Sequence, residues 1–210
     1  IKGNEHVAGV CAYNMYGTIS NCYNEGTVCG GGNNVGGVCS ESYGGTVTNC
    51  YNAGAVSGTD NYVGGLCGNN YYGTITYSFN RGQVSGVSNV GGICGLDSEG
   101  NIKNCYYLSG TANSGIGFEN DGVKTESKTE EQFADGEVCY MLNGYRSAGT
   151  AENPLIWYQN LSAEGGDAYP VYTRTETNTV YGGYDHGGTT LYCGNDSKIP
   201  TAHPHAHGYD

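Results

Sequence analysis

The stretch Val63-Gly64-Gly65-Leu66-Cys67, followed by Gly73-Thr74-Ile75-Thr76-Tyr77-Ser78-Phe79-Asn80, decides the fold of this 210-residue chain because it recurs along the sequence. The opening pentapeptide has counterparts at residues 7–11, 35–39 and 90–94, so the copies begin 28, 28 and 27 residues apart. A fixed period of this length is typical of stacked supersecondary units. The sequence therefore predicts a repeat architecture for residues 1–115.

Short β-prone runs within each copy are separated by glycine and asparagine. In the second copy these runs cover residues 35–39, 46–51 and 55–57. Such punctuation is typical of strands and turns rather than of helices. Runs this short cannot form an independent sheet, but each can pair in parallel with its equivalents in neighbouring copies. We predict a mainly β fold, a parallel β-helix (β-solenoid) of about four 28-residue coils with a small C-terminal α+β capping segment.

Aligned copies place similar residues in columns. Aliphatic residues recur at 10, 38, 66 and 93 and at 19, 47, 75 and 102, and aromatic residues recur at 23, 51, 79 and 106. Side chains of one column are expected to stack in register. A turn ladder of amides is expected at Asn21, Asn49 and Asn104, interrupted by Tyr77. Paired glycines such as Gly36-Gly37 allow either a positive φ or a close approach of coils.

Seven of the ten cysteines also fall in columns. One column contains Cys11, Cys39, Cys67 and Cys94, and a second contains Cys22, Cys50 and Cys105. The third copy has Ser78 in the second column, so disulfides between the columns would leave Cys67 without a partner. This favours structural ladders of small buried thiols that serine can replace. Disulfides stay open as an alternative, because coils ~4.8 Å apart fall within the Cα separation of a bridge.

The repeated motifs resemble those of a known family. Val-Gly-Gly-Leu-Cys-Gly, Gly-Thr-Ile-Thr, Asn-Cys-Tyr-Asn and Val-Ser-Gly are similar to the GLUG-motif repeats of large secreted or wall-attached bacterial proteins. These include adhesin-like surface proteins and the repeat regions of some IgA-specific metallopeptidases. The resemblance covers residues 3 to about 115 and implies an extracellular repeat stalk at the bacterial cell surface. It implies no catalytic residues, since the zinc motif His-Glu-x-x-His of the peptidases is absent from the sequence.

The chain after residue 115 is expected to cover the open edge of the last coil. We assign residues 116–175 to this capping segment. One helix is predicted over about 130–143, beginning at a capping box of Thr129 and Gln132 and ending at Gly144. Short strands are predicted at 155–159 and 169–172, with Trp157 sealing the edge. Residues 176–210 are predicted to form a hairpin and a polar tail or linker.

Residues suited to catalysis or metal binding do not converge in the sequence. The acids of the repeats fall in no shared column, and neither Cys139 nor Cys193 has a histidine at an informative spacing. His203, His205 and His207 alternate in the tail, but a metal site needs fixed geometry and more ligands. Thr18, Thr46 and Thr74 form a column that suits ice binding, yet Asn101 ends it. We predict no enzyme activity, no cofactor and no metal site.

The net charge of −12 limits the partners that the chain can attract. Because an acidic surface repels phosphate, we expect no nucleic acid and no anionic membrane among them. The sequence has no run of 18 apolar residues, so we expect no membrane span. It opens with Ile1-Lys2-Gly3, which resembles neither an initiator methionine nor a signal peptide. We therefore expect the chain to be a piece of a longer protein.

We hypothesise a non-catalytic extracellular structural or binding module, such as a stalk, an adhesin or a fibre subunit. The alternative is the accessory repeat region of a larger secreted hydrolase, such as an IgA-type metallopeptidase. The partners considered are a host glycan, a host protein and further copies of the chain in a fibre. Tyrosines expected at turns form the candidate binding surface, with ordinary turn residues as the competing interpretation: Tyr13, Tyr16, Tyr43, Tyr62, Tyr71 and Tyr72.

Overall fold

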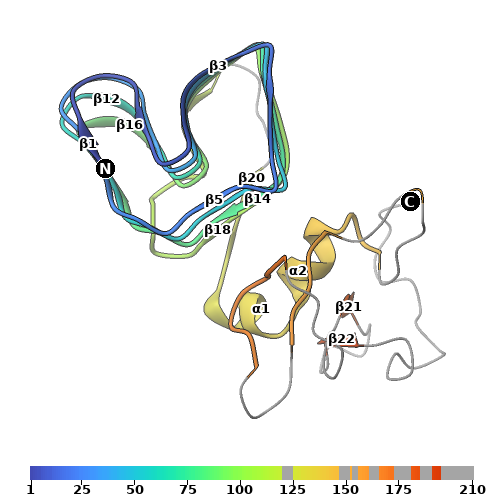
Figure 1. Ribbon diagram of the computed structural model, residues 1–210. Helices are drawn as coiled ribbons and strands as arrows, with labels where there is room; N and C mark the ends of the chain where they lie inside the picture. The colour runs from blue at the N-terminus through green and yellow to red at the C-terminus, as the bar shows by residue number, and fades with distance from the viewer. Residues whose placement is uncertain are drawn as a thin grey trace. The chain divides into compact units, whose positions relative to one another are not determined.

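A computed structural model describes residues 1–119, 125–146, 152, 156–160, 166–172, 181–184 and 191–194. The chain has two compact units, Ile1–Ser127 and Lys128–Asp210. The first unit is a parallel β-solenoid of four coils, in which strands pair with their equivalents one coil away (Figure 1). Val35, for example, is in register with Val7 on one side and Val63 on the other. The predicted fold class is confirmed.

Four stacked sheets make up the solenoid, where the sequence predicted three runs per coil. The first sheet consists of β1 (Lys2–Gly3), β6 (Val28–Gly30), β11 (Val56–Gly58) and β15 (Val84–Ser85). The second consists of β2 (Val7–Ala8), β7 (Val35–Gly36), β12 (Asn61–Gly64) and β16 (Ser88–Gly91). The third consists of β3 (Cys11–Met15), β8 (Cys39–Tyr43), β13 (Cys67–Tyr71), β17 (Cys94–Ser98) and β19 (Ile116–Glu119).

The fourth sheet has seven strands and continues past the expected boundary at residue 115. It consists of β4 (Thr18–Ser20), β5 (Tyr23–Asn24), β9 (Thr46–Thr48), β10 (Tyr51–Asn52), β14 (Thr74–Asn80), β18 (Asn101–Leu108) and β20 (Thr125–Lys128). Strand β20 pairs with β18, and β19 pairs with β17. These two strands extend the solenoid unit to Ser127.

The Val-Gly-Gly-x-Cys run is a chain reversal rather than a single strand. In the third coil β12 ends at Gly64 and β13 begins at Cys67, and the chain folds back between them (Figure 1). A Cβ atom on Gly64 would lie 1.9 Å from the carbonyl oxygen of Cys67 and 2.8 Å from the amide nitrogen of Gly95. No side chain fits there. Since Gly64 and Gly65 are not among the glycines with positive φ, the pair serves the close approach of backbones.

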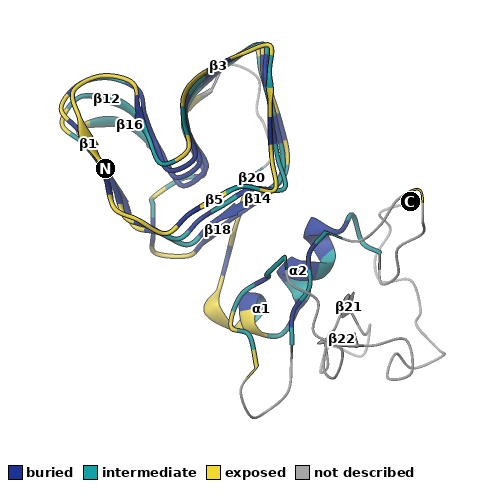
Figure 2. Cartoon of the chain, in the orientation of Figure 1, coloured by how far each residue is buried: buried dark blue, intermediate teal, exposed yellow. Residues whose placement is uncertain are grey.

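Two apolar stacks run along the solenoid, and Figure 2 shows buried segments at matching places in successive coils. The smaller stack is made of valines: Val7, Val28, Val35, Val56, Val63 and Val84. The larger stack holds the central cysteines and every member of the two predicted aliphatic columns except Val10, which is 43% exposed in the first coil. Val38 and Leu66 are fully buried in it. Burial of each such side chain contributes ~1.5–3 kcal/mol, so the repeated columns hold the coils together.

Asparagines stabilise the coil in two different ways. Asn21, Asn49 and Asn104 are turn residues with φ between 50° and 53°, and Tyr77 adopts φ 49° at the same position. The hydrogen-bonded amide ladder lies three residues later, at Asn24, Asn52 and Asn80. In this ladder Nδ2 of Asn24 donates to Oδ1 of Asn52, and Nδ2 of Asn52 donates to Oδ1 of Asn80, both over 2.8 Å. The turn position of Asn21, Asn49 and Asn104 agrees with the sequence-based expectation, and the ladder at Asn24, Asn52 and Asn80 was not predicted.

Two short helices begin the second unit in place of the one predicted over 130–143. Helix α1 covers Glu130–Ala134 and α2 covers Glu137–Leu142. Gly136 separates them with φ 93°, a conformation that glycine adopts without strain and that interrupts a helix. The helices bury an apolar face that includes Phe133 and Leu142.

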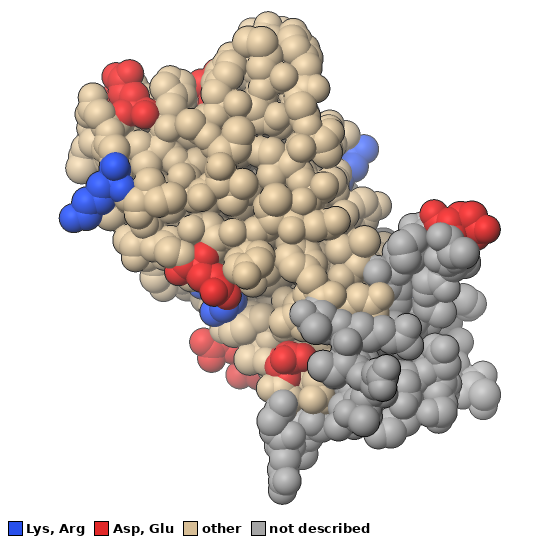
Figure 3. Space-filling model, in the orientation of Figure 1, with Lys and Arg blue, Asp and Glu red and all other residues tan. Residues whose placement is uncertain are grey.

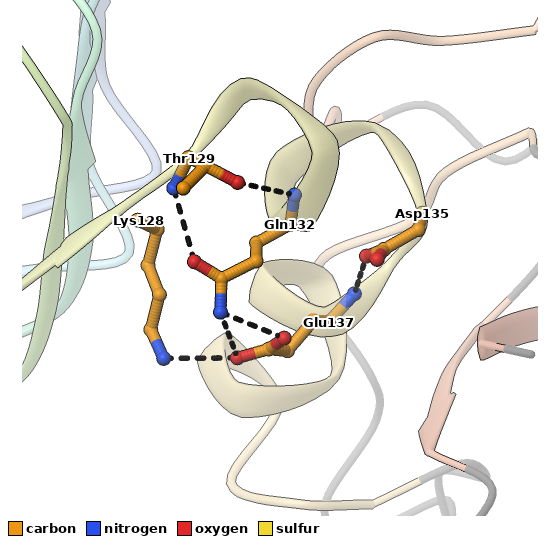
Figure 4. A network of polar contacts seen from close by, with 5 residues as sticks. All are labelled: Lys128, Thr129, Gln132, Asp135 and Glu137. Atoms are coloured by element: carbon orange, nitrogen blue, oxygen red, sulfur yellow. Dashed lines mark hydrogen bonds and ion pairs between the residues drawn. The ribbon is translucent and has the colours of Figure 1, made fainter. Parts of the chain in front are cut away.

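A polar network fixes the start of these helices (Figure 4). Thr129 and Gln132 form the predicted capping box, in which the backbone nitrogen of Gln132 donates to Oγ1 of Thr129 over 3.2 Å. Nζ of Lys128 lies 2.9 Å from Oε1 of Glu137. The Gln132 side chain also donates to both oxygens of Glu137 over 3.0 Å. The network therefore ties the first turns of α1 and α2 together.

Asn143 and the backbone of Trp157 are joined by two hydrogen bonds in the second unit. Oδ1 of Asn143 accepts from the amide nitrogen of Trp157 over 3.1 Å, and its Nδ2 donates to the Trp157 carbonyl over 2.8 Å. Tyr158 and Val171 form an antiparallel bridge within the predicted short strands. Strands β21 (Tyr181–Tyr184) and β22 (Leu191–Gly194) pair antiparallel. The histidines of the tail lie outside the described residues.

Candidate functional site

The structure places the first cysteine column in register across β3, β8, β13 and β17. Each thiol donates to the backbone carbonyl two residues later. The sulfur to oxygen distances are 3.4, 3.2, 3.2 and 3.1 Å for Cys11, Cys39, Cys67 and Cys94. Every coil therefore satisfies its thiol locally, without a covalent bond to the next coil.

Serine makes equivalent contacts in the second cysteine column. Ser78 Oγ donates to the Thr76 carbonyl over 2.8 Å and accepts from the amide nitrogen of Cys50 over 2.9 Å. The thiol of Cys50 donates in the same way to the carbonyl of Thr48 over 3.2 Å. This equivalence explains how a serine can stand among the cysteines of the column.

Several buried thiols of the two columns have a raised pKa. All nine cysteines whose side chains the structure describes are free thiols. Burial raises the pKa of Cys50 and of Cys105 to about 12, and a hydrogen bond with Cys67 together with burial raises the pKa of Cys39. The nucleophile and metal ligand is the thiolate, which such groups do not form at neutral pH. Over the described ranges, no group of three or more His, Cys, Asp or Glu residues is arranged to hold a metal ion.

Four of the six candidate tyrosines meet at one edge of the solenoid, where the third sheet turns into the fourth. We call Tyr16, Tyr43, Tyr71 and Tyr72 the tyrosine corner. The ring centroids of Tyr43 and Tyr71 are 5.3 Å apart and tilted by 32°. The Tyr16 ring meets Tyr43 edge-on at 5.5 Å, and the Tyr72 ring meets Tyr71 edge-on at 4.4 Å. The corner is a continuous cluster of rings from three successive coils.

The backbone turn explains how these rings come together. Tyr16, Gly44, Tyr72 and Glu99 occupy the same turn position in successive coils, with φ of 54°, 58°, 53° and 52°. A Cβ atom on Gly44 would lie 2.5 Å from Cε1 of Tyr16, so the Tyr16 ring occupies the space above this glycine. The missing side chain in the second coil thereby lets Tyr16 reach Tyr43.

The rings of Tyr16 and Tyr72, at the turn position, are open to solvent. Tyr16 is 71% exposed and Tyr72 is 50% exposed. A hydrogen bond with Tyr71, together with the charge of Glu99, raises the pKa of Tyr72 to about 12. A hydrogen bond with Tyr16 raises the pKa of Tyr43. The corner therefore presents aromatic rings whose Tyr43 and Tyr72 hydroxyls have raised pKa values.

Tyr62 lies at a different turn, whereas Tyr13 lies close enough to Tyr43 to contribute to the raised pKa of the Tyr43 hydroxyl. Tyr13 belongs to β3, in register with Glu41, and its ring meets the His6 ring edge-on at 6.4 Å. Tyr62 occupies a different turn position, with φ 65°. Of the six tyrosines, Tyr62 is therefore the one that the turn geometry separates from the corner.

Glu41 makes polar contacts across the chain reversal that the sequence did not predict. Nδ2 of Asn34 donates to Oε2 of Glu41 over 2.9 Å, and Nδ1 of His6 lies 3.4 Å from the same oxygen. Asn34 and Glu41 flank the Val35-Gly36-Gly37-Val38-Cys39 run, so they face each other only when that run folds back. Reading the glycine pair as a reversal would have predicted the contact.

The GLUG motif matches this chain twice. The matches cover residues 3–28 and 59–85, which are in the first and third coils, and they confirm the resemblance inferred from the residues. No curated protein sequence matches the chain.

The fold is similar to the crystal structure of a candidate immunoglobulin A1 protease from Bacteroides ovatus. The TM-score is 0.54 at 24% sequence identity, and the match covers 83% of this chain and 55% of that protein. This chain thus spans little more than half of that protein's length, and the likeness at this identity concerns the fold. Among the described residues, no helix has the length and apolar character needed to cross a membrane.

Proposed function

We propose that this chain is a non-catalytic repeat module of a secreted or surface-attached bacterial protein, with the tyrosine corner as its contact surface. The GLUG matches support the type of module, because that repeat was recognised on the same residues that build the coils. The observation that carries the contact surface is the cluster of four tyrosine rings at one edge, two of which are half or more exposed.

The chemistry of the solenoid supports a non-catalytic role. The thiols of Cys50 and Cys105 are buried and their pKa values are raised to about 12, and the acids of the repeats fall in no shared column. On the face shown in Figure 3, Lys, Arg, Asp and Glu side chains of the described residues lie apart rather than gathered in one patch. A hydrolase needs paired acids, a nucleophile with its base, or a metal on a rigid frame. A rigid stack that presents one exposed aromatic cluster is instead suited to binding.

Exposed tyrosines suit a glycan or protein partner. Each ring offers an apolar face, and its hydroxyl donates and accepts hydrogen bonds. The rigid turns hold the rings in place before binding, which reduces the entropy lost on association. We place a host glycan first among the partners, followed by a host protein and by further copies of the chain in a fibre.

A glycan-array screen tests this proposal. The full chain is compared with a Tyr16→Ser/Tyr72→Ser double variant and with a Tyr62→Ser control, which alters a tyrosine at a different turn position. Circular dichroism and thermal melting verify that each variant is folded. We expect the double variant to lose glycan binding and the control to keep it. Equal binding by the double variant, or equal loss in the control, would overturn the role of the corner.

The alternative is an accessory repeat region of a larger secreted hydrolase, such as an IgA-type metallopeptidase. It is favoured by the fold likeness to a protein described as a candidate immunoglobulin A1 protease, of which this chain covers 55%. Sequencing the gene on both sides of the chain tests it. A His-Glu-x-x-His zinc motif in the same open reading frame would support this alternative, and a wall anchor with further repeats would contradict it.

A further inference from the structure

We propose that His6 and Glu41 bind a divalent transition metal ion of the Zn²⁺ type, with the side-chain amides of Asn34 and Asn69 beside it. We call these four residues the reversal cluster, because they flank the chain reversal of the first coils. His6 comes from the first coil, Asn34 and Glu41 from the second, and Asn69 from the third. The cluster shares no residue with the tyrosine corner, so its binding is independent of the proposed contact surface.

The spacing of the two ionisable side chains fits one tetrahedral ion. Nδ1 of His6 lies 3.4 Å from Oε2 of Glu41. This separation is longer than the ~2.9 Å of a usual N–H···O hydrogen bond. Two ligand atoms that are each ~2.1 Å from a tetrahedral Zn²⁺ ion lie ~3.4 Å from each other. The imidazole and the carboxylate therefore have the spacing of two ligands on one ion.

Asn34 holds the Glu41 carboxylate in place. Its Nδ2 donates to Oε2 of Glu41 over 2.9 Å. Carboxylates that ligate metals are typically oriented by hydrogen bonds of this kind. The Glu41 side chain is 16% exposed and the His6 side chain is 44% exposed, so an ion can reach the pair from the side of His6.

Two buried amide oxygens of the cluster have no hydrogen-bond donor among the described residues. They are Oδ1 of Asn34 and Oδ1 of Asn69. Asn34 is 8% exposed and its amide is the one that binds Glu41, whereas Asn69 is in register with Glu41 one coil further along. Buried acceptors without a partner are rare and indicate an ion or an ordered water. Amide oxygens can ligate a cation or accept from the water that it carries.

The donor set favours Zn²⁺ over Mg²⁺ and Ca²⁺. An imidazole nitrogen suits Zn²⁺, Cu²⁺ and Ni²⁺, whereas Mg²⁺ and Ca²⁺ prefer six or more oxygen ligands. The cluster has two residues of the strongly ligating types, so it is smaller than the groups of three or more His, Cys, Asp or Glu that the described ranges lack. Amide oxygens and water would complete the coordination. The net charge of −12 also attracts cations.

Calorimetric titration with Zn²⁺ tests the inference on the full chain. The histidines of the tail can bind Zn²⁺ as well, so the parent for this test is the variant His203→Ala/His205→Ala/His207→Ala. We expect this parent to bind one equivalent of Zn²⁺ in a saturable manner, at least tenfold more tightly than Mg²⁺ or Ca²⁺.

Further substitutions in this parent assign the ligands. His6→Gln and Glu41→Gln should each weaken Zn²⁺ binding at least tenfold. Glu25→Gln is the matched control, because Glu25 is a carboxylate that lies near the Tyr51 hydroxyl and outside the cluster, and it should leave the affinity unchanged. Asn69→Asp adds a carboxylate in register with Glu41 and should tighten binding at least threefold.

Thermal melting provides a second measurement, because an ion that binds the folded state raises the melting temperature. Zn²⁺ should raise the melting temperature of the parent and of Glu25→Gln, but not that of His6→Gln. Absence of saturable Zn²⁺ binding by the parent would overturn the inference and leave His6 and Glu41 as a polar pair alone. Binding that neither His6→Gln nor Glu41→Gln weakens would overturn it as well. If these two variants fail to fold, Asn69→Asp replaces them, and an unchanged affinity in that variant would overturn the inference.

Discussion

Replacement of Asn52 by alanine tests the amide ladder of the solenoid most directly. Asn52 is fully buried and makes three hydrogen bonds of 2.8 Å: it donates to Oδ1 of Asn80 and to the carbonyl of Gly54, and it accepts from Nδ2 of Asn24. Each bond contributes about 1 kcal/mol net, so their loss is expected to lower the free energy of unfolding by about 3 kcal/mol. That is a large part of the total stability of ~5–15 kcal/mol typical of a domain.

The assay is urea unfolding followed by far-UV circular dichroism for the solenoid and by fluorescence of Trp157, the one tryptophan of the chain, for the second unit. Asn101→Ala is the control, because this asparagine is exposed at the start of β18. We expect the control to change stability by no more than ~0.5 kcal/mol. If Asn52→Ala costs less than about 1 kcal/mol, or no more than the control, the ladder does not stabilise the coils in the way argued.

Asn52→Asp adds a pH test of the same rung. The new carboxyl would face acceptor oxygens of Asn80 and Gly54 in a buried position, which raises its pKa in the folded state. A raised folded pKa means that the variant is relatively stable below the unfolded pKa of about 4 and loses stability as the pH rises above it. A variant whose stability relative to the parent is the same at pH 3.5 and pH 7 would contradict this account.

The remaining predictions concern packing and charge. Gly64→Ala should destabilise the solenoid by about 3 kcal/mol, because the new Cβ would lie 1.9 Å from a carbonyl oxygen. Gly26→Ala is the control and should melt within a few degrees of the parent, because the atom nearest to its Cβ would be 3.6 Å away. Equal melting temperatures of the two variants would contradict the close backbone approach at the reversal. Ser78→Cys should cost less than about 1 kcal/mol in urea unfolding, and a loss above about 2 kcal/mol would refute the equivalence of serine and thiol in this column. Glu137→Gln should lower the stability reported by tryptophan fluorescence by about 2 kcal/mol, because it removes the carboxylate 2.9 Å from the Lys128 ammonium; an unchanged transition would show that the pair is not stabilising.

The break between helices α1 and α2 could not be predicted from the sequence. Thr129 and Gln132 predict the start of a helix because their side chains can cap its first backbone N–H groups. The structure has that capping box. Gly136 lies inside an apolar pattern that continues to Leu142, and such a pattern fits one helix with a tolerated glycine or two helices with a break. In the structure Gly136 has a positive φ, which interrupts the helix and gives two short helices.

The sequence by itself determined the stack. A period of 27 or 28 residues with similar side chains in each column predicts that the copies stack in register, because each coil then buries the same apolar residues of the next. Register followed from it, since Tyr51 falls on Phe79 and Ile75 on Ile102 once the copies are aligned.

The tertiary structure alone decided how each coil bends. Glycine pairs permit a turn or a close approach, and only the structure shows that a Cβ atom on Gly64 would lie 1.9 Å from the Cys67 carbonyl oxygen, so that no side chain fits there. The tyrosine corner likewise depends on Gly44, whose missing side chain lets the Tyr16 ring lie against Tyr43 in the next coil. Column patterns record which residues repeat, because burial depends on residue type, but they do not record the turn angles that bring exposed side chains of different columns together.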